Sequence, residues 1–255
     1  MKKHLKSLVI CLGLIIINYL MGDIVSYIFF KLTGTKVDYD KYTYLIVFIS
    51  DIILLILAHF ILLKYNKKLF GKNTFKKIKI TDAINIILFG FGSSVFFWIF
   101  SSILIILFPS NTDIADFSMY EYNFILQSLL PILLIPICEE LLFRYIIFGY
   151  LRKNYNIVLA IIIQALLFGI YHLEIVQGIY TTLFGIILAL AYIYCNSLWG
   201  SIILHITFNL FGLGIVPIIG FSNILIQYLV IILGIISLVI SILNILKKYD
   251  YDLSK

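Results

Sequence analysis

Residues 136–149 read PICEELLFRYIIFG and place two adjacent carboxylates and an arginine inside a run that is otherwise apolar enough to cross a bilayer. An ionisable side chain at the centre of a membrane helix costs at least about 2.5 kcal/mol, and such side chains usually mark a functional site. The stretch therefore predicts a transmembrane helix whose Glu139, Glu140 and Arg144 do more than pack.

The composition indicates an integral membrane protein. Of 255 residues, 62% are hydrophobic and 13% are charged, against about a quarter charged in an ordinary soluble domain. The net charge of +6 does not indicate a nucleic-acid partner, because the basic residues lie in short segments between apolar runs, where they act as topology signals. Cys11, Cys138 and Cys195 lie in apolar runs without paired spacing, so neither a disulfide framework nor a zinc knuckle is expected.

Eight apolar stretches are long enough to span a bilayer, since a membrane helix needs about 20 residues. They are expected near residues 7–30, 43–63, 83–108, 124–150, 157–173, 177–195, 198–216 and 223–246. The first has the basic lead of a secretory signal, but no small-x-small cleavage pattern follows, so we expect a retained helix. The sequence thus predicts an all-α, polytopic transmembrane bundle of about eight spans, forming a single membrane domain over residues 1–255.

The lysines predict the orientation of these spans. Basic residues cluster at the amino end, after the second span, after the fourth span and in the tail, as Lys2, Lys3, Lys6, Lys64, Lys67, Lys68, Lys72, Lys76, Lys77, Lys79, Arg152, Lys153, Lys247 and Lys248. Eight crossings put all four clusters on one side. The loop after the third span has no lysine or arginine, and its charged residues are Asp113, Asp116 and Glu121. Both termini are therefore predicted to be cytoplasmic.

Helix geometry assigns different surroundings to the two carboxylates. Glu140 and Arg144 are four residues apart, so they share a face and can form an ion pair within the helix. Glu139 projects about 100° away from Glu140 and must find its partner on another helix. An unpaired carboxylate in an apolar site suits a general base or acid, although a buried packing network or a transport relay would use the same residues.

Two other predicted spans contribute polar side chains at helical spacing. His172 follows Phe168 by four residues, and Asn209 follows His205 by four residues. Singly, each histidine is more often a packed group than a catalytic one. Other polar residues in apolar segments fit a packing role, and these are Asp23, Asp51, His59 and Gln164.

Taken together, three motifs resemble the signature of a known family. Glu139-Glu140-x-x-x-Arg144, Phe168-x-x-x-His172 and His205-x-x-x-Asn209, in this order and on separate predicted helices, are similar to the motifs of the CAAX prenyl protease and bacteriocin-processing (CPBP) family of intramembrane proteases, also called the Abi family. The predicted core that carries them is residues 124–216.

The resemblance implies roles for seven residues. Glu139 and His172 would activate a water for attack on a peptide carbonyl, and His205 and Asn209 would stabilise the oxyanion. Glu140 and Arg144 would hold the helix geometry, and Phe168 would shape the pocket wall. The resemblance favours a mechanism without a metal, but zinc stays open, in which case Glu139, His172 and His205 would be its ligands.

We therefore expect a glutamate-dependent intramembrane endopeptidase, a multi-pass protein of the cell membrane that cleaves a membrane-associated peptide or protein. Its partners are that substrate and the lipid bilayer, with no nucleic acid and no cofactor expected. Two alternatives use the same sequence features. One is a non-catalytic immunity or regulatory protein that binds a bacteriocin or signalling partner, and the other is a proton-coupled transporter with the carboxylates as its relay.

Overall fold

A computed structural model describes residues 2–33, 39–64, 74–109, 125–216 and 223–253. Every regular element in these ranges is helical. The α-helices are α1 (Lys2–Thr33), α2 (Tyr39–Lys64), α3 (Ile80–Leu107), α4 (Ile135–Glu140), α5 (Gly149–Leu151), α6 (Ile157–Ile170), α7 (Ile175–Cys195), α8 (Leu198–Asn209) and α10 (Ile224–Leu253). Three further segments are π-helical, namely η3 (Ile125–Leu134), η4 (Leu141–Phe148) and η5 (Leu210–Ile215).

The helices coincide with the apolar stretches predicted from the sequence. Within the described ranges, six helices are long and apolar enough to cross a membrane, judged by length and composition. The other two predicted spans are α6, which has 14 residues, and the rod over residues 125–151, which π-helical segments divide. The prediction of an all-α polytopic bundle is confirmed, while the count of eight crossings stays a prediction.

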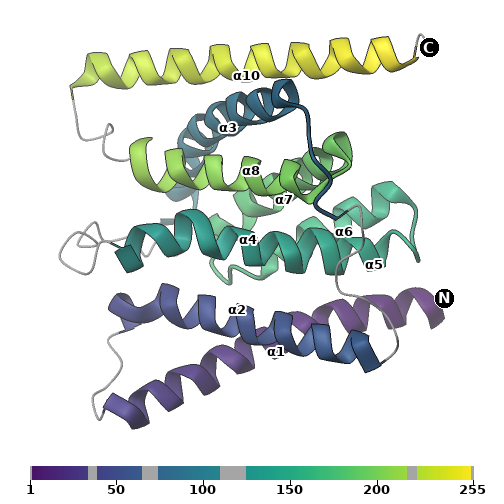
Figure 1. Cartoon of the computed structure of the whole chain (residues 1–255). Coiled ribbons are helices and arrows are strands. Elements are labelled where there is room, and N and C mark those ends of the chain that lie inside the picture. Colours follow the sequence, from purple (N-terminus) through teal and green to yellow (C-terminus); the bar gives the residue numbers. More distant parts are fainter. Residues whose placement is uncertain (1, 34–38, 65–73, 110–124, 217–222, 254–255) are drawn as a thin grey trace.

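The segment with the paired carboxylates occupies the middle of the bundle. Helices α1 and α2 pack together on one side, and α10 packs against α3 on the opposite side (Figure 1). Between them, α4 contacts both α2 and α8, and α8 in turn contacts α3 and α7. The hydrophobic core follows the same arrangement, because fully buried Phe143, Phe148, Phe168 and Phe184 come from η4, α6 and α7. The charged residues of α4 are thereby kept away from the outer surface.

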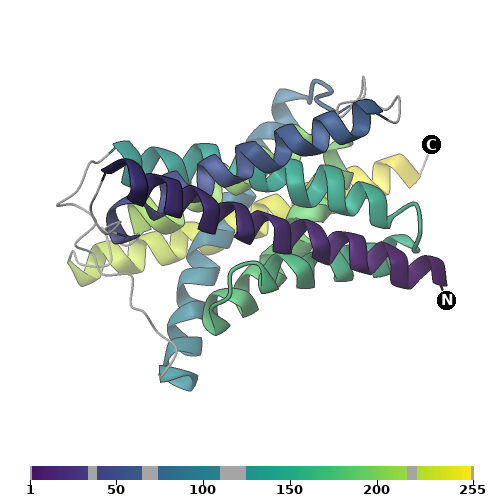
Figure 2. The same cartoon turned by 90° about the horizontal axis from the view of Figure 1, so that it is seen from below.

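The start of α1 and the end of α10 lie at the same end of the bundle, as both views show (Figures 1 and 2). Hydrogen bonds link the described parts of the predicted basic segments at this end. The Tyr155 hydroxyl donates to the His4 carbonyl, while Asp82 accepts from the Tyr194 hydroxyl and from Lys248. This arrangement agrees with an even number of crossings. Which face is cytoplasmic stays a prediction from the lysines, and Lys67, Lys68, Lys72, Asp113, Asp116 and Glu121 lie outside the described residues.

The rod over residues 125–151 departs from a regular α-helix on either side of the paired carboxylates. It is π-helical over η3 and η4, while the short α4 between them, which ends at Glu140, and the terminal α5 are α-helical. Pro131 and Pro136 lie in this region, where each removes a backbone donor that a regular helix needs. Because π-helical turns occur frequently at functional sites, the interruption singles out this rod.

Close contact between α3 and α10 depends on two glycines that face each other. A β-carbon added at Gly234 would lie 2.7 Å from Val95 Cβ, and one added at Gly92 would lie 2.8 Å from the Gly234 carbonyl oxygen. Small residues allow membrane helices to approach closely, which increases their van der Waals packing. This contact fixes α10 on the outside of α3.

Replacing Gly234 by alanine should therefore destabilise the protein by about 1–3 kcal/mol, because the added methyl group overpacks the contact with Val95. Thermal unfolding in detergent measures the effect. Gly22→Ala is the matched control, since a β-carbon at Gly22 meets nothing within 4 Å. Equal melting temperatures for the two variants would show that α3 and α10 do not pack as described.

Candidate functional site

The centre of the site is a buried ion pair between neighbouring turns of one rod. Arg144 Nη1 lies 3.1 Å from Glu140 Oε1, and both side chains are 0% exposed. The pair predicted from the four-residue spacing is thus present. The Arg144 guanidinium also lies over the Phe168 ring, 4.4 Å from its centroid, so a cation–π contact supplements the ion pair. A charge that is buried this completely requires such partners to be tolerated.

His205 of α8 lies between the two carboxylates. Its Nδ1 is 2.9 Å from Glu140 Oε1, and its Nε2 is 3.6 Å from Glu139 Oε2. A carboxylate accepts, so Glu140 fixes the proton on Nδ1 and turns Nε2 toward Glu139. The Phe184 ring stacks edge-on at 5.4 Å and limits rotation of the imidazole. Glu139 therefore has the partner on another helix that its position on α4 requires.

His172 lies beyond the end of α6, which corrects the predicted span of 157–173. The helix ends at Ile170, and Leu173 adopts a left-handed backbone with φ of 57°. The helix stops because Glu174 caps α7 immediately afterwards, accepting from the backbone of Val176 and Gln177. A sequence pattern based on apolar runs could not detect this stop, since every residue from 165 to 171 is compatible with a helix.

The backbone at the C-terminal end of α6 nevertheless fixes the His172 ring. The His172 backbone N–H donates to Gly169, one residue short of the helical pattern. His172 Nδ1 is 2.8 Å from the Phe168 carbonyl oxygen, and since a carbonyl only accepts, Nδ1 carries the proton. In a neutral ring, Nε2 then has a free lone pair, as a general base or a ligand would need.

Phe168 connects the two histidines. Its ring contacts His172 at a centroid distance of 5.0 Å and His205 at 6.0 Å, each nearly edge-on. It also receives the Arg144 guanidinium on its face. The first, second and third sequence motifs therefore meet at this one fully buried ring.

Asn209 binds the rod that carries the carboxylates. Its Nδ2 donates to the Pro131 carbonyl at 2.9 Å. In a π-helix that carbonyl would accept from the residue five positions later, but residue 136 is a proline without an N–H. Asn209 supplies the missing donor, and one N–H of its amide group remains for another acceptor.

Four polar residues near the site were not singled out by the sequence. Asp51, assigned a packing role from its sequence context, accepts from Asn18 at 2.8 Å and from the Tyr171 hydroxyl at 3.3 Å. The Tyr19 hydroxyl donates to the Tyr171 carbonyl. No short motif links residues so far apart, so only the fold brings them together.

The described side chains do not form a zinc site as they are placed. In the ranges that the structure describes, no three His, Cys, Asp or Glu side chains are arranged to hold a metal ion. Glu139, His172 and His205, the ligands considered from the sequence, do not form such a group as their side chains are placed. Tetrahedral zinc sites need at least three protein ligands directed at one point, so zinc binding would require these side chains to turn toward one another.

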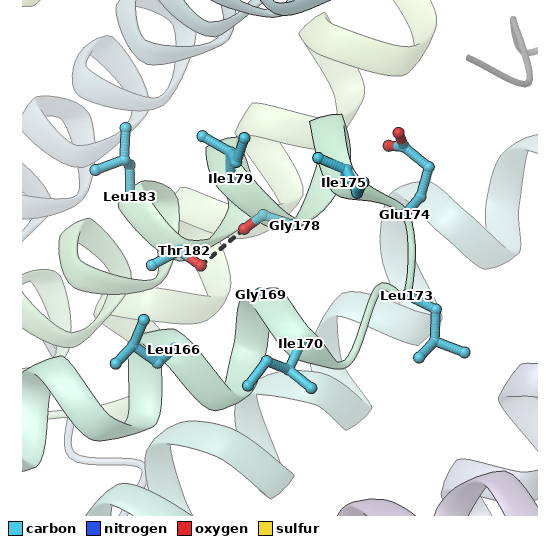
Figure 3. Close-up of a pocket in the computed structure, with 10 residues that line it drawn as sticks. All are labelled: Leu166, Gly169, Ile170, Leu173, Glu174, Ile175, Gly178, Ile179, Thr182 and Leu183. Carbon is cyan, nitrogen blue, oxygen red and sulfur yellow. Dashed lines mark hydrogen bonds between the residues drawn. The ribbon is translucent and has the colours of Figure 1, made fainter. Parts of the chain in front are cut away.

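An apolar groove lies beside the turn that carries His172 (Figure 3). It measures about 600 Å³ and runs between α6 and α7, from Leu166 and Leu183 to Leu173. The Thr182 hydroxyl donates to the Gly178 carbonyl along its floor. None of the seven predicted site residues lines it. The groove is thus a neighbour of the candidate site and contains none of its chemistry.

Removal of the arginine tests the central ion pair. Arg144→Met should destabilise the protein by about 3–5 kcal/mol, because Glu140 would remain buried without its cation. Unfolding in mixed detergent and SDS micelles measures the loss, and Lys153→Met, at an exposed position just after the same rod, is the control. The double variant Glu140→Gln/Arg144→Met should recover part of the stability. An Arg144→Met protein as stable as the control would contradict the arrangement.

Comparison with known proteins finds a family match over the segment that carries the site. Residues 121–211 match the family model described as type II CAAX prenyl endopeptidase Rce1-like. A 76-residue stretch is 36% identical to the "Putative membrane peptidase YdiL" of Bacillus subtilis (strain 168). That alignment covers 30% of this chain and 31% of the relative. No solved structure matches the chain at a significant level.

The family match covers the rod with the carboxylates, the His172 turn and α8, and so includes all seven residues of the three motifs. The family resemblance predicted from those motifs is thereby confirmed. Together with six helices apolar enough to span, the match also supports the predicted location. The chain is a multi-pass integral membrane protein whose residues 121–211 match the type II CAAX prenyl endopeptidase Rce1-like family.

Proposed function

We propose that this protein is an intramembrane endopeptidase that hydrolyses a peptide bond of a membrane-associated peptide or protein. The observation that carries the proposal is the placement of His205 between Glu139 and Glu140, with Arg144 neutralising the second carboxylate. This arrangement leaves one carboxylate without a cation of its own beside imidazole nitrogens. The family match over residues 121–211 supports the same reaction class.

In the proposed reaction, Glu139 and His172 activate a water molecule. Glu139 accepts a proton from the water while the oxygen attacks the carbonyl carbon of the substrate, which forms a tetrahedral intermediate. The lone pair on His172 Nε2 orients the same water, because Nδ1 is held by the Phe168 carbonyl. The proton held by Glu139 then moves to the departing nitrogen as the C–N bond breaks. The products are a carboxylate and an amine.

His205 and Asn209 are proposed to stabilise the oxyanion. A protonated His205 donates through Nε2 while its Nδ1–H stays on Glu140, so the ring need not move during the reaction. Asn209 contributes the N–H that its bond to Pro131 leaves over. Arg144 and Phe168 act indirectly, since one neutralises Glu140 and the other fixes the spacing of both histidines.

The substrate class follows from the surroundings of the site. Glu139, Glu140 and His205 are all at most 7% exposed and lie in the middle of an apolar bundle. A peptide that reaches them must partition into or next to the bilayer, which favours a lipid-anchored or hydrophobic segment over a soluble peptide. Two alternatives, a non-catalytic binding protein and a proton-coupled transporter, would use the fold without cleaving a bond.

Variants of the water-activating pair distinguish these possibilities. Glu139→Gln and His172→Ala should each lower the rate of cleavage of membrane-anchored peptides at least about 100-fold, because proton transfer is lost. Purified protein in lipid nanodiscs with a peptide library and mass spectrometry provides the measurement. Asp23→Asn, which alters an exposed carboxylate on α1, should cleave normally. Cleavage at the wild-type rate in both site variants would contradict the proposal.

Chelation tests the proposed independence from metal. Because the proposed mechanism uses Glu139 and His172 without a metal, cleavage should continue unchanged after dialysis against a strong zinc chelator. The same preparation with zinc added back is the control. Activity that disappears on chelation and returns with zinc would show that Glu139, His172 or His205 serves as a ligand.

A further inference from the structure

The residue before His172 is held by the first two helices of the chain. Tyr19 on α1 donates its hydroxyl proton to the Tyr171 carbonyl. The Tyr171 hydroxyl donates to Asp51 on α2 at 3.3 Å, and Asn18 Nδ2 reaches both that hydroxyl, at 2.9 Å, and Asp51, at 2.8 Å. Asn18, Asp51 and the Tyr171 hydroxyl thus form a closed triangle of hydrogen bonds. We call the four residues Asn18, Tyr19, Asp51 and Tyr171 the Tyr171 clamp.

The clamp contains a buried carboxyl group that packing alone does not require. Asp51 and Asn18 are each 3% exposed, and an apolar pair in their place would avoid the cost of burying a carboxylate. One oxygen of each side chain, Asp51 Oδ2 and Asn18 Oδ1, has no hydrogen-bond partner within the described part of the chain. The polar cluster is therefore costly, and the group that it holds lies next to the candidate site.

The backbone at the clamp needs an external restraint. Leu173 is left-handed, a conformation that is unfavourable for a residue other than glycine. The end of α6 supplies only short-range bonds to residues 171–173. The Tyr171 ring adds contacts with Phe143 at 5.3 Å and with Tyr19 at 5.6 Å. Backbone strain that the surrounding structure maintains is frequently found at functional sites.

We propose that Asp51 is a positioning residue, which acts through the Tyr171 clamp to fix the turn that carries His172. The first two helices precede the segment that matches the family, residues 121–211, and the clamp gives them a direct part in the site. The proposal rests on the proposed function only for the role of His172. Asp51 acts through its hydrogen bonds, so an uncharged acceptor of the same shape can replace it.

Three variants test the clamp by kinetics. Asp51→Leu and Tyr171→Phe should each lower kcat about tenfold or more while KM changes less than about twofold, because a misplaced His172 affects the chemical step and leaves substrate binding intact. Asp51→Asn should keep most of the wild-type kcat, since its Oδ1 still accepts. Asp23→Asn is the control. Full activity in Asp51→Leu, or equal losses in Asp51→Asn and Asp51→Leu, would overturn the inference.

Hydrogen exchange provides a readout that needs no catalysis. In detergent, backbone amides of residues 169–174 should exchange about tenfold faster in Asp51→Leu and Tyr171→Phe than in the wild type, and at the wild-type rate in Asp23→Asn. Tyr171→Phe removes a single oxygen, so we expect it to fold even if Asp51→Leu does not. Unchanged exchange in Tyr171→Phe would refute the clamp even if the protein cleaves no peptide. Faster exchange without any cleavage would support the clamp and remove the proposed function alone.

Discussion

The buried ion pair between Glu140 and Arg144 is the constraint on which the remaining structure depends. Two full charges at 0% exposure in an apolar bundle are tolerated only when each has partners in fixed positions. Arg144 meets Glu140 and the Phe168 ring, and Glu140 meets Arg144 and His205. Satisfying these charges therefore draws α6 and α8 onto the rod over residues 125–151. The polar groups of the candidate site come together as a result.

The irregular backbone has a part in the same assembly. Pro136 has no backbone N–H to donate to the Pro131 carbonyl, and the Asn209 side chain on α8 donates to that carbonyl instead. The missing backbone bond is thus replaced by a contact between helices. The early end of α6 similarly frees the Phe168 carbonyl, which accepts from His172. In each case a backbone group that a regular helix would satisfy is bound by a motif side chain. The positions of the motif residues are thus set by broken helical bonds as much as by helical ones.

Much of the fold could be predicted from the sequence, because bilayer thickness fixes the length of an apolar run. Each predicted stretch coincides with a helical segment, and the fifth ends three residues earlier than expected. The difference arises because Glu174 caps α7 and Leu173 is left-handed, so the helix ends early. Neither feature changes the hydrophobicity of the sequence. The π-helical segments were not predicted either, since their cause is hydrogen bonding within a run of apolar residues.

The candidate site was predictable where its residues share a helix or a motif. The spacing of Glu140 and Arg144 gave the ion pair directly, and the motifs gave the histidines. Asp51, Asn18 and Tyr171 were missed, because their contacts join residues 33 to 153 positions apart. Asp51 in particular looked like a packing group, since a single carboxylate in an apolar run has no partner that a sequence can reveal.

An experimental map of the protein in lipid nanodiscs, obtained by cryo-electron microscopy with a bound antibody fragment, tests the central claim most directly. We expect density for His205 between the two carboxylates of α4. Arg144 should form an ion pair with Glu140, and His172 should lie within hydrogen-bond distance of the Phe168 carbonyl. A map in which Glu139 faces lipid, or in which α8 lies away from α4 so that His205 touches neither carboxylate, would contradict the claim.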